Sequence, residues 1–564
     1  MREAIVLHFA SGGARTAGSV AAAPAAAHPT ARCGWAAFVG LVLAVALSGC
    51  GDGGSPPPAA RPNVLWIVAD DMGAQIGAFG DPLARTPNLD RLADEGVRYP
   101  NAFSTSGVCA PSRVTLMTGM YATSIGAHHM RSINGGYQPV PPPWVKTFTE
   151  YLRAAGYYTS STGKLDYQFS GSFDGAPLTN WDEPNGDWSG RAPGQPFFAH
   201  VTIFDTHESR LFGSRPTQTD ADAVVVPPYY PDTPIVRRDL ARHYDNVASL
   251  DDRVGQLLDR LDAEGLADDT IVFFFPDNGR GLPRDKRWVY DGGIHQPLIV
   301  RWPAHLAPGA VDEQLVSFVD LAPTALALAG VAVPDHMPGR VFLGPRRAPE
   351  PAFVFAAEDR NDEAPDRIRA VRDRRFKYVR NYQPETPYGQ PIVFRDALGT
   401  MKEIFRLHDA GLLLPPADWF YRATKPVEEL YDTVDDPFEV ENLADRPEHQ
   451  QRLARMRAAL DRWVVETGDL GATPEAELAE RYWPGGVQPA TPPPAIRATA
   501  RADGTVEIAI TAVDGASIAW TLDPADPPRW QLYSGPIRVA ADATVRARAI
   551  RYGWGESEES VAGP

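Results

Sequence analysis

Cysteine is scarce in this sequence, which has three among 564 residues: Cys33, Cys50 and Cys109. Three cysteines cannot form a disulfide framework, so a disulfide-stabilised scaffold is excluded. Basic residues are outnumbered too, because 54 Lys and Arg stand against 71 Asp and Glu, and the net charge is −17. A chain this acidic is a poor general ligand for phosphate backbones, and we therefore expect no nucleic-acid partner.

The sequence also lacks an internal repeat of about 20–50 residues. Its content of 44% hydrophobic and 22% charged residues is ordinary for a globular protein, which excludes disorder, collagen and coiled coil as descriptions of the whole chain. The length exceeds one domain of about 100–200 residues, so we expect two or three domains, or one large domain with appendages.

The N-terminus has the character of an export signal. The apolar run at residues 36–49 is too short for a membrane span of about 20 residues and fits the core of a signal peptide. It ends in Leu47-Ser48-Gly49-Cys50, which resembles a bacterial lipobox, and residues 51–61 form a polar tether. The resemblance implies a lipoprotein signal peptide over residues 1–50, whose leader is removed together with Cys33, and a lipid anchor at Cys50 facing the periplasm or cell surface. The alternative is a plain signal peptide.

Residues 62–345 alternate short buried-type strands with amphipathic helices. Strands are predicted near 63–68, 197–204 and 271–275, and the apolar spacing between Leu240 and Leu261 predicts a long helix. This alternation favours an α/β domain with a large, mostly parallel, doubly wound sheet. Ligands of such sheets bind at the carboxyl ends of the strands, where polar residues recur here.

The rest of the chain reads differently. In residues 346–480, apolar and polar residues alternate as in antiparallel strands, and the segment ends in an amphipathic helix. This pattern predicts a smaller C-terminal subdomain. A Pro-rich linker at 481–495 precedes short β-type runs at 496–564, which predict a small appended β-sandwich. On the runs 515–521, 533–536 and 547–549, this module resembles a chitobiase C-terminal-like β domain. Its aromatic residues either stack on sugar rings or fill a small core: Trp520, Trp530, Tyr533 and Trp554.

Carboxylates follow two of the predicted strands. Asp70 and Asp71 end one strand, and Asp277 and Asn278 end another. If the two strands are neighbours, three carboxylates and an amide oxygen converge. Such an oxygen-rich set suits a hard cation, Ca²⁺ or Mg²⁺.

Cys109 begins a predicted helix, with Arg113 one turn further on. The positive end of a helix and a nearby guanidinium favour a thiolate, so one hypothesis is a nucleophilic thiolate. The alternative is a buried structural cysteine. A soft thiolate is a poor partner for a hard cation, so the two features disagree unless the cysteine is converted into an oxygen-bearing group.

The run Cys109-Ala110-Pro111-Ser112-Arg113, followed by 116–119, resembles the signature of type I sulfatases in the alkaline-phosphatase-like superfamily. In that family a formylglycine-generating enzyme oxidises the cysteine to Cα-formylglycine, which removes the disagreement. The resemblance covers roughly residues 62–465, and its further motifs follow in the family's order: Asn63 to Asp71, Gly163-Lys164, His207 after a Pro-Phe-Phe strand, Asp277-Asn278-Gly279, Lys286 before Asp291-Gly292-Gly293, 320–324 and 429–443.

The resemblance implies roles for individual residues. The implied ligands of Ca²⁺, or Mg²⁺ as the alternative, are Asp70, Asp71, Cys109, Asp277 and Asn278. The implied catalytic residues are Cys109 as nucleophile, Arg113 as the residue that helps to hold the attacking hydroxyl, Lys164 and Lys286 as cations on the sulfuryl oxygens and leaving group, and His207 as general acid. Arg284 and Arg287 are alternatives to Lys286.

The implied activity is hydrolysis of sulfate esters, or of N-sulfates, on a sulfated carbohydrate. One alternative is a phosphodiesterase or phosphonate monoester hydrolase of the same superfamily. Another is a glycan-binding lipoprotein with an inactive site.

One position departs from the family's pattern. The family has Gly-Lys-x-His where this sequence has Gly163-Lys164-Leu165-Asp166. Asp166 could orient a partner instead of the missing histidine. His128 and His129 either take part in the site or form a pair at the surface or in the core.

Overall fold

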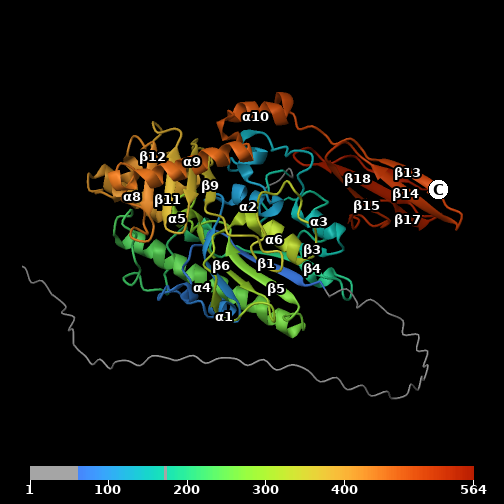
Figure 1. The fold of residues 1–564 in the computed structure, drawn as a ribbon, viewed down its shortest axis with the longest axis horizontal. Coiled ribbons are helices and arrows are strands. Elements are labelled where there is room, and N and C mark those ends of the chain that lie inside the picture. The colour runs from blue at the N-terminus through green and yellow to red at the C-terminus, as the bar shows by residue number, and fades with distance from the viewer. Residues whose placement is uncertain (1–60, 170–174, 564) are drawn as a thin grey trace, which may run out of the picture. The chain divides into compact units, whose positions relative to one another are not determined.

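The computed structural model describes residues 61–169 and 175–563. Its centre is an eight-stranded sheet with the strand order β3-β4-β1-β5-β6-β2-β7, in which β8 also pairs with β2 (Figure 1). Pairing is parallel between β3 and β4, and on both sides of β1, whereas β6 runs antiparallel to its two neighbours. The predicted large, mostly parallel sheet is confirmed. Its strands are β1 Asn63–Ala69, β2 Val97–Phe103, β3 Tyr158–Thr162, β4 Phe197–Ile203, β5 Thr270–Pro276, β6 His295–Arg301, β7 Ala310–Val311 and β8 Val316–Ser317.

Helices cover both faces of this sheet, as a doubly wound fold requires (Figure 1). Successive side chains of β1 point to opposite faces. Trp66 and Val68 pack with α2 (Cys109–Thr118), α3 (Phe148–Ala154) and α6 (Leu321–Leu328). Leu65 and Ile67 pack on the other face with α1 (Pro87–Glu95) and α4 (Pro234–Ala263).

The long helix α4 begins earlier than the apolar spacing predicts. Thr233 precedes it and accepts a hydrogen bond from the backbone N–H of Val236, and Pro234 occupies the first helical position. Both are favoured starts of a helix. Its buried residues include Leu250 and Val254, which confirms the predicted apolar face.

A second, antiparallel sheet has the order β12-β11-β10-β9. The helix α9 (Gln450–Thr467) packs against it, and the ring of Trp463 stacks on Phe355 at 5.3 Å. The smaller antiparallel C-terminal sheet is thus confirmed. Its strands are β9 Val354–Glu358, β10 Ile368–Arg372, β11 Phe376–Asn381 and β12 Glu428–Asp432, and the remaining α-helices of the described chain are α5 Asp291–Ile294, α7 Val393–Asp396, α8 Gly399–Asp409 and α10 Glu475–Tyr482.

The last part of the chain forms two small sheets, ordered β13-β14-β17 and β16-β15-β18-β19. Ile508, Val539 and Val545 are buried between them, and Trp520 and Tyr533 pack against this cluster. These two aromatic side chains therefore fill the small core, whereas Trp554 lines a separate cavity. The strands are β13 Ala495–Ala500, β14 Thr505–Thr511, β15 Ala516–Thr521, β16 Gln531–Leu532, β17 Ile537–Ala540, β18 Val545–Arg551 and β19 Ser560–Ala562.

Within the described residues, every helix is too short or too polar to cross a membrane. The predicted signal peptide, its lipobox cysteine Cys50 and Cys33 lie in residues 1–60, outside the described residues.

Candidate active site

Two neighbouring strand ends bring the predicted carboxylates together. β1 pairs in parallel with β5, with Ala69 opposite Pro276, so the residues that follow both strands emerge at one edge. The backbone N–H of Asp71 donates to Asp277 Oδ1 at 3.1 Å, and Asn278 Nδ2 donates to Asp71 Oδ1 at 2.9 Å. The side chains concerned are fully buried: Asp70, Asp71, Asp277 and Asn278.

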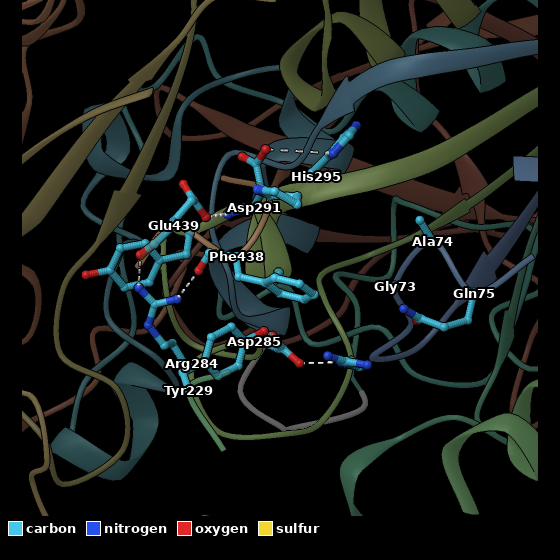
Figure 2. A pocket seen from close by; sticks show the side chains of 14 residues that line it. Gly73, Ala74, Gln75, Tyr229, Arg284, Asp285, Asp291, His295, Phe438 and Glu439 are labelled. Atoms are coloured by element: carbon cyan, nitrogen blue, oxygen red, sulfur yellow. Dashed lines mark hydrogen bonds and ion pairs between the residues drawn. The ribbon is translucent and has the colours of Figure 1, made fainter. Parts of the chain in front are cut away.

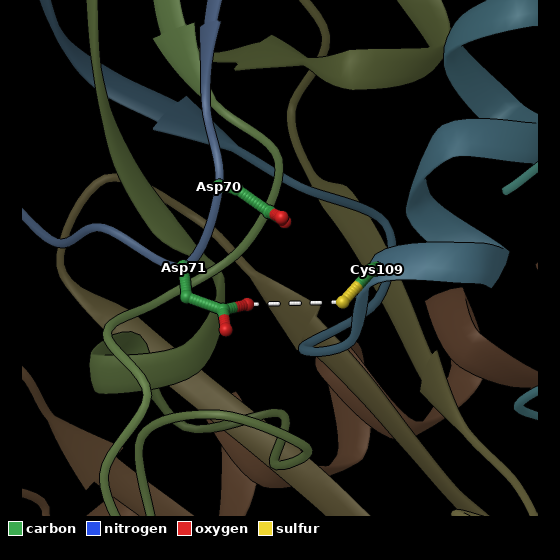
Figure 3. A group of neighbouring side chains, drawn as sticks. All are labelled: Asp70, Asp71 and Cys109. Atoms are coloured by element: carbon green, nitrogen blue, oxygen red, sulfur yellow. Dashed lines mark hydrogen bonds between the residues drawn. The ribbon is translucent and has the colours of Figure 1, made fainter. Parts of the chain in front are cut away.

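Cys109 is the first residue of α2 and faces this set. Its Sγ lies 3.7 Å from Asp71 Oδ1, and a dashed line marks this contact in Figure 3. Ligand atoms of Asp70, Asp71 and Cys109 all lie within 4.8 Å of one another, and among the described residues this is the one group of three or more such side chains that could hold a metal ion. The structure therefore unites the oxygen-rich set and the cysteine.

The thiol of Cys109 is not activated. Burial raises its pKa to about 12, against the opposing effect of Lys164 and Lys286, and the nearby Asp71 raises it further. The sequence-based hypothesis of a thiolate favoured by the helix terminus and Arg113 is therefore wrong for the unmodified side chain. Desolvation outweighs a helix terminus at a fully buried position.

Three cations surround the carboxylates. Arg113 Nε donates to Asp277 Oδ2 at 2.8 Å, and Lys164 Nζ lies 3.2 Å from Asp70 Oδ1. Lys286 Nζ donates to Asp71 Oδ2 at 2.6 Å. The shortest contact of each predicted cation is with a different carboxylate, and Arg113 also reaches Asp70 at 3.4 Å.

The two alternatives to Lys286 have other partners. Arg284 donates to the backbone carbonyls of Phe438 and Glu439 at 2.8 and 2.6 Å, beside a cavity of about 170 Å³ shown in Figure 2. Arg287 forms a two-bond ion pair with Glu208, at 3.0 and 2.9 Å. Lys286 is therefore the member of this basic run that reaches Asp71.

Burial and neighbouring charges shift the pKa values of the site's carboxyl groups in opposite directions. Burial favours the neutral carboxyl group, yet Lys164 and Arg113 outweigh it and lower the pKa of Asp70 to about 2. For Asp277, burial together with the charges of Asp70 and Asp71 outweighs Arg113 and raises the pKa to about 7. Asn278 Oδ1 is also buried without a hydrogen-bond partner. Carboxylate oxygens and an unsatisfied amide oxygen are the donor set of a hard divalent cation, so these residues fit one.

His207 lies on the turn after β4, with its ring stacked on Phe204 at 4.1 Å. Burial, together with Lys286 and Lys164, lowers its pKa to about 4 in spite of Asp71 and Asp70, which raise it. The backbone N–H of Ser209 donates to Nδ1 at 3.3 Å. The neutral ring therefore carries its hydrogen on Nε2, which lies 3.9 Å from Asp71 Oδ2.

Asp166, the departure from the family's pattern, is buried next to the cations. Its Oδ2 lies 3.9 Å from Lys164 Nζ and 3.6 Å from the Arg131 guanidinium. Asp166 and Arg131 both have a φ of 51°, a conformation that is costly outside glycine. The carboxylate thus links the cation deep in the site to an arginine that lines a cavity of about 610 Å³.

His128 and His129 form a buried pair with ring centres 4.3 Å apart. Burial lowers the pKa of both rings to about 3. The backbone N–H of Arg360 donates to His129 Nδ1 at 3.3 Å, and the charged neighbours of His128 include Arg369 rather than the carboxylates beside Cys109. The pair belongs to the core.

Glu208 is a site residue that sequence reasoning missed. Its backbone N–H donates to Asp71 Oδ2 at 2.8 Å, and its carboxylate lies 3.2 Å from Lys286 Nζ. Its position directly after His207 at a strand end was the available signal. Glu208 holds Lys286 against the set of carboxylates.

A doubly wound sheet with this arrangement of carboxylates, cations and Cys109 at its edge defines the class of alkaline-phosphatase-like hydrolases. Comparison with known proteins identifies the family within that class. The family model for sulfatase matches residues 62–192 and 186–331, and the model for the N-sulphoglucosamine sulphohydrolase C-terminal region matches residues 282–389. The chain belongs to the sulfatase family, whose members are sulfuric ester hydrolases.

Two relatives cover most of the chain. It is 40% identical over 548 residues to an ulvan-active sulfatase of Formosa agariphila, covering 88% of this chain and 90% of that protein. It is 30% identical over 491 residues to the N-sulphoglucosamine sulphohydrolase of Homo sapiens, and the match covers 75% of this chain and 94% of that protein.

Solved structures share the fold. One is a protein in complex with its substrate, D-glucosamine-2-N,6-O-disulfate, with a TM-score of 0.52, 17% identity, and coverage of 74% of this chain and 99% of that one. Another is a phosphonate monoester hydrolase from Silicibacter pomeroyi, with a TM-score of 0.53, 20% identity, and coverage of 73% and 97%.

Proposed function

We propose that this sulfatase removes sulfate, as an ester or an N-sulfate, from a sulfated carbohydrate, with Cys109 converted to Cα-formylglycine by a formylglycine-generating enzyme. The observation that carries the proposal is the position of Cys109. A buried thiol with a pKa of about 12, 3.7 Å from a carboxylate, is of little use as a nucleophile, whereas an oxygen-bearing group there suits its neighbours. The carbohydrate is supported by the relatives, which are named for ulvan and N-sulphoglucosamine.

The residues that would hold Ca²⁺, or Mg²⁺ as the alternative, are Asp70, Asp71, Asp277, Asn278 and the modified residue 109. When bound, the cation would help to neutralise this set. The hydrate of formylglycine would supply one hydroxyl for attack on sulfur and a second that permits release of sulfate.

The chain's own side chains would carry the remaining steps. Lys164 and Lys286 are placed to donate hydrogen bonds to the sulfuryl oxygens and to offset their negative charge. Arg113 holds Asp277 and donates to the carbonyl of Lys164 at 2.9 Å, which fixes that lysine's backbone. His207 presents Nε2–H for the oxygen of the leaving group.

Removal of the cation should lower stability. After chelation, adding Ca²⁺ at about 100 times its dissociation constant should raise the free energy of unfolding by about 2.7 kcal/mol. Asp70→Asn should lose most of this gain, measured as the rise in melting temperature. Asp251→Asn removes the charge of a buried carboxylate of α4, which accepts a hydrogen bond from the backbone N–H of Leu89 in α1, and should keep the gain. An equal response of both variants would contradict the metal assignment.

The choice between sulfate and phosphate chemistry needs a direct comparison of substrates. Matured protein should hydrolyse 4-nitrophenyl sulfate with a kcat/KM at least about 100-fold above that for bis(4-nitrophenyl) phosphate, a difference of about 2.7 kcal/mol in transition-state binding. The reverse order would make the phosphodiesterase or phosphonate monoester hydrolase the better description. Binding of a sulfated glycan with no turnover of either substrate would favour the inactive glycan-binding protein.

We also propose that the protein is exported and anchored at Cys50, facing the periplasm or cell surface. The run at 36–49 and the lipobox-like Leu47-Ser48-Gly49-Cys50 support this.

A further inference from the structure

A cluster of arginines lies beside the turn that carries His207. It lines a cavity of about 290 Å³. We call it the arginine cavity; its charged residues are Arg210, Arg215, Arg242, Arg253, Asp205 and Asp245. Four guanidinium groups line it against two carboxylates. A third carboxylate, Asp239, pairs with Arg242 at 3.3 Å from outside the cavity, which still leaves an excess of positive charge in a chain whose net charge is −17.

Both carboxylates of the arginine cavity already have partners. Asp205 accepts a hydrogen bond from Ser249 Oγ at 2.7 Å and pairs with Arg253 at 2.7 Å. Asp245 accepts from the backbone N–H of Gln218 at 2.8 Å and of Thr219 at 2.9 Å, and pairs with Arg85 from outside the cavity. Neither acid therefore neutralises the two remaining exposed arginines.

Those two arginines are Arg210 and Arg215. Within the described part of the chain, no carboxylate lies within 4.0 Å of either guanidinium. Arg215 donates one hydrogen bond, to the backbone carbonyl of Arg210 at 3.0 Å, and Arg210 lies over the ring of Phe204 at 5.9 Å. Guanidinium groups without a counter-ion at one cavity are suited to bind sulfate or carboxylate.

The backbone that carries these arginines is held in place. Arg242 is buried, and it donates to the carbonyl oxygens of Leu211 at 2.7 Å and Arg215 at 3.1 Å. Its Nε is buried without a hydrogen-bond partner. The loop that carries Arg210 and Arg215 is therefore fixed by Arg242, and the arginine cavity contains a hydrogen-bond donor that has no acceptor.

The arginine cavity adjoins the active site. The backbone N–H of Arg210 donates to the carbonyl of His207 at 2.7 Å. Phe204 contacts both sides, since its ring stacks on His207 at 4.1 Å and lies under Arg210. By contrast, the 610 Å³ cavity beside Asp166 has no excess of cations, because its acids outnumber its arginines: Asp362, Glu363 and Glu475 against Arg131 and Arg360.

We propose that the arginine cavity is a subsite for a second anionic group, sulfate or carboxylate, on a polymeric glycan whose scissile sulfate lies beside Cys109. This rests on the proposed carbohydrate substrate. The subsite contributes to binding of the polymer and does not contact the bond that is cleaved. A substrate with a single anionic group therefore gains nothing from it.

The test compares a polymer with a small substrate. In the double variant Arg210→Ala/Arg215→Ala, the KM for ulvan, the glycan of the 40% identical relative, should rise at least about tenfold with kcat unchanged. The kcat/KM for 4-nitrophenyl sulfate should stay within about twofold, because that substrate ends at the active site. The pair Arg210→Lys/Arg215→Lys keeps the charge without the planar fork and should give an intermediate KM.

The matched control is Arg462→Ala/Arg497→Ala, which removes the same charge from two exposed arginines elsewhere. If the KM for ulvan rises no more in the cavity variant than in this control, the subsite is disproved while the sulfatase activity stands. If the wild type cleaves 4-nitrophenyl sulfate but no sulfate is released from ulvan, binding of ulvan to Cys109→Ala decides. If the cavity substitutions abolish ulvan binding by Cys109→Ala and the control substitutions do not, the subsite is supported. If the cavity substitutions leave ulvan binding intact, the subsite is disproved. Failure to cleave 4-nitrophenyl sulfate would instead count against the proposed function.

Discussion

Cys109→Ser should give a folded protein that turns over no sulfate ester, with kcat at least about 10⁴-fold below the matured wild type. A serine hydroxyl can attack sulfur once. The serine sulfate that results has no second hydroxyl on the same carbon, so it cannot collapse to expel sulfate. Release of sulfate from 4-nitrophenyl sulfate measures the loss, and the small change from Sγ to Oγ should leave the melting temperature close to the wild-type value.

Peptide masses supply the control for this variant. In matured wild-type protein, the tryptic peptide from Tyr99 to Arg113 should be about 18 Da lighter than its unmodified form, because a thiol is replaced by an aldehyde. Cys109→Ser should show a peptide without that loss. Turnover above about a hundredth of wild type in Cys109→Ser would place the nucleophile elsewhere. A wild-type peptide that keeps its thiol, in a host that matures other sulfatases, would likewise contradict formylglycine at position 109 as the nucleophile.

The polar ends of β1 and β5 could be predicted from the sequence because each strand is a short apolar run followed directly by acids. Their adjacency could not, because about 200 residues separate the two strands and the pairing of distant strands has no local signal. The metal hypothesis was therefore conditional until the strand order β4-β1-β5 was known.

Local reasoning was wrong where burial decides the chemistry. A cysteine at a helix start beside Arg113 predicts a thiolate, but Arg113 pairs with Asp277 and Asp70, and desolvation dominates the thiol. The same limit applies to Lys286, because its two basic neighbours left the assignment open until the fold turned Arg284 toward Phe438 and paired Arg287 with Glu208. The arginine cavity is out of reach of sequence reasoning, since its members are spread over residues 205–253.

His207→Ala should affect substrates according to their leaving group. A sugar hydroxyl is a strongly basic leaving group and needs a proton, so kcat on a sulfated sugar should fall by about 10³-fold. 4-Nitrophenolate leaves readily without one, and kcat on 4-nitrophenyl sulfate should fall less than about tenfold. Ser209→Ala removes a hydroxyl partner of His207 Nδ1, 2.8 Å away, and leaves the imidazole in place. It should therefore lower kcat on the sulfated sugar much less than His207→Ala does.

The role of His207 follows from the ratio of two losses in His207→Ala, the loss of kcat on the sulfated sugar and the loss of kcat on 4-nitrophenyl sulfate. Neither loss alone identifies that role. Nε2 lies 3.9 Å from Asp71, close enough to the centre of the site to reach either the leaving oxygen or a sulfuryl oxygen. A donor to the leaving oxygen matters in proportion to the charge that develops there, whereas a donor to the sulfuryl group serves all substrates equally. Equal losses on the two substrates would therefore contradict the general-acid assignment and make His207 a ligand of the sulfuryl group. Asp166 stands where the family has its second histidine, so a second imidazole would not be available beside Lys164 to replace it, and the proton would then have to come from another donor.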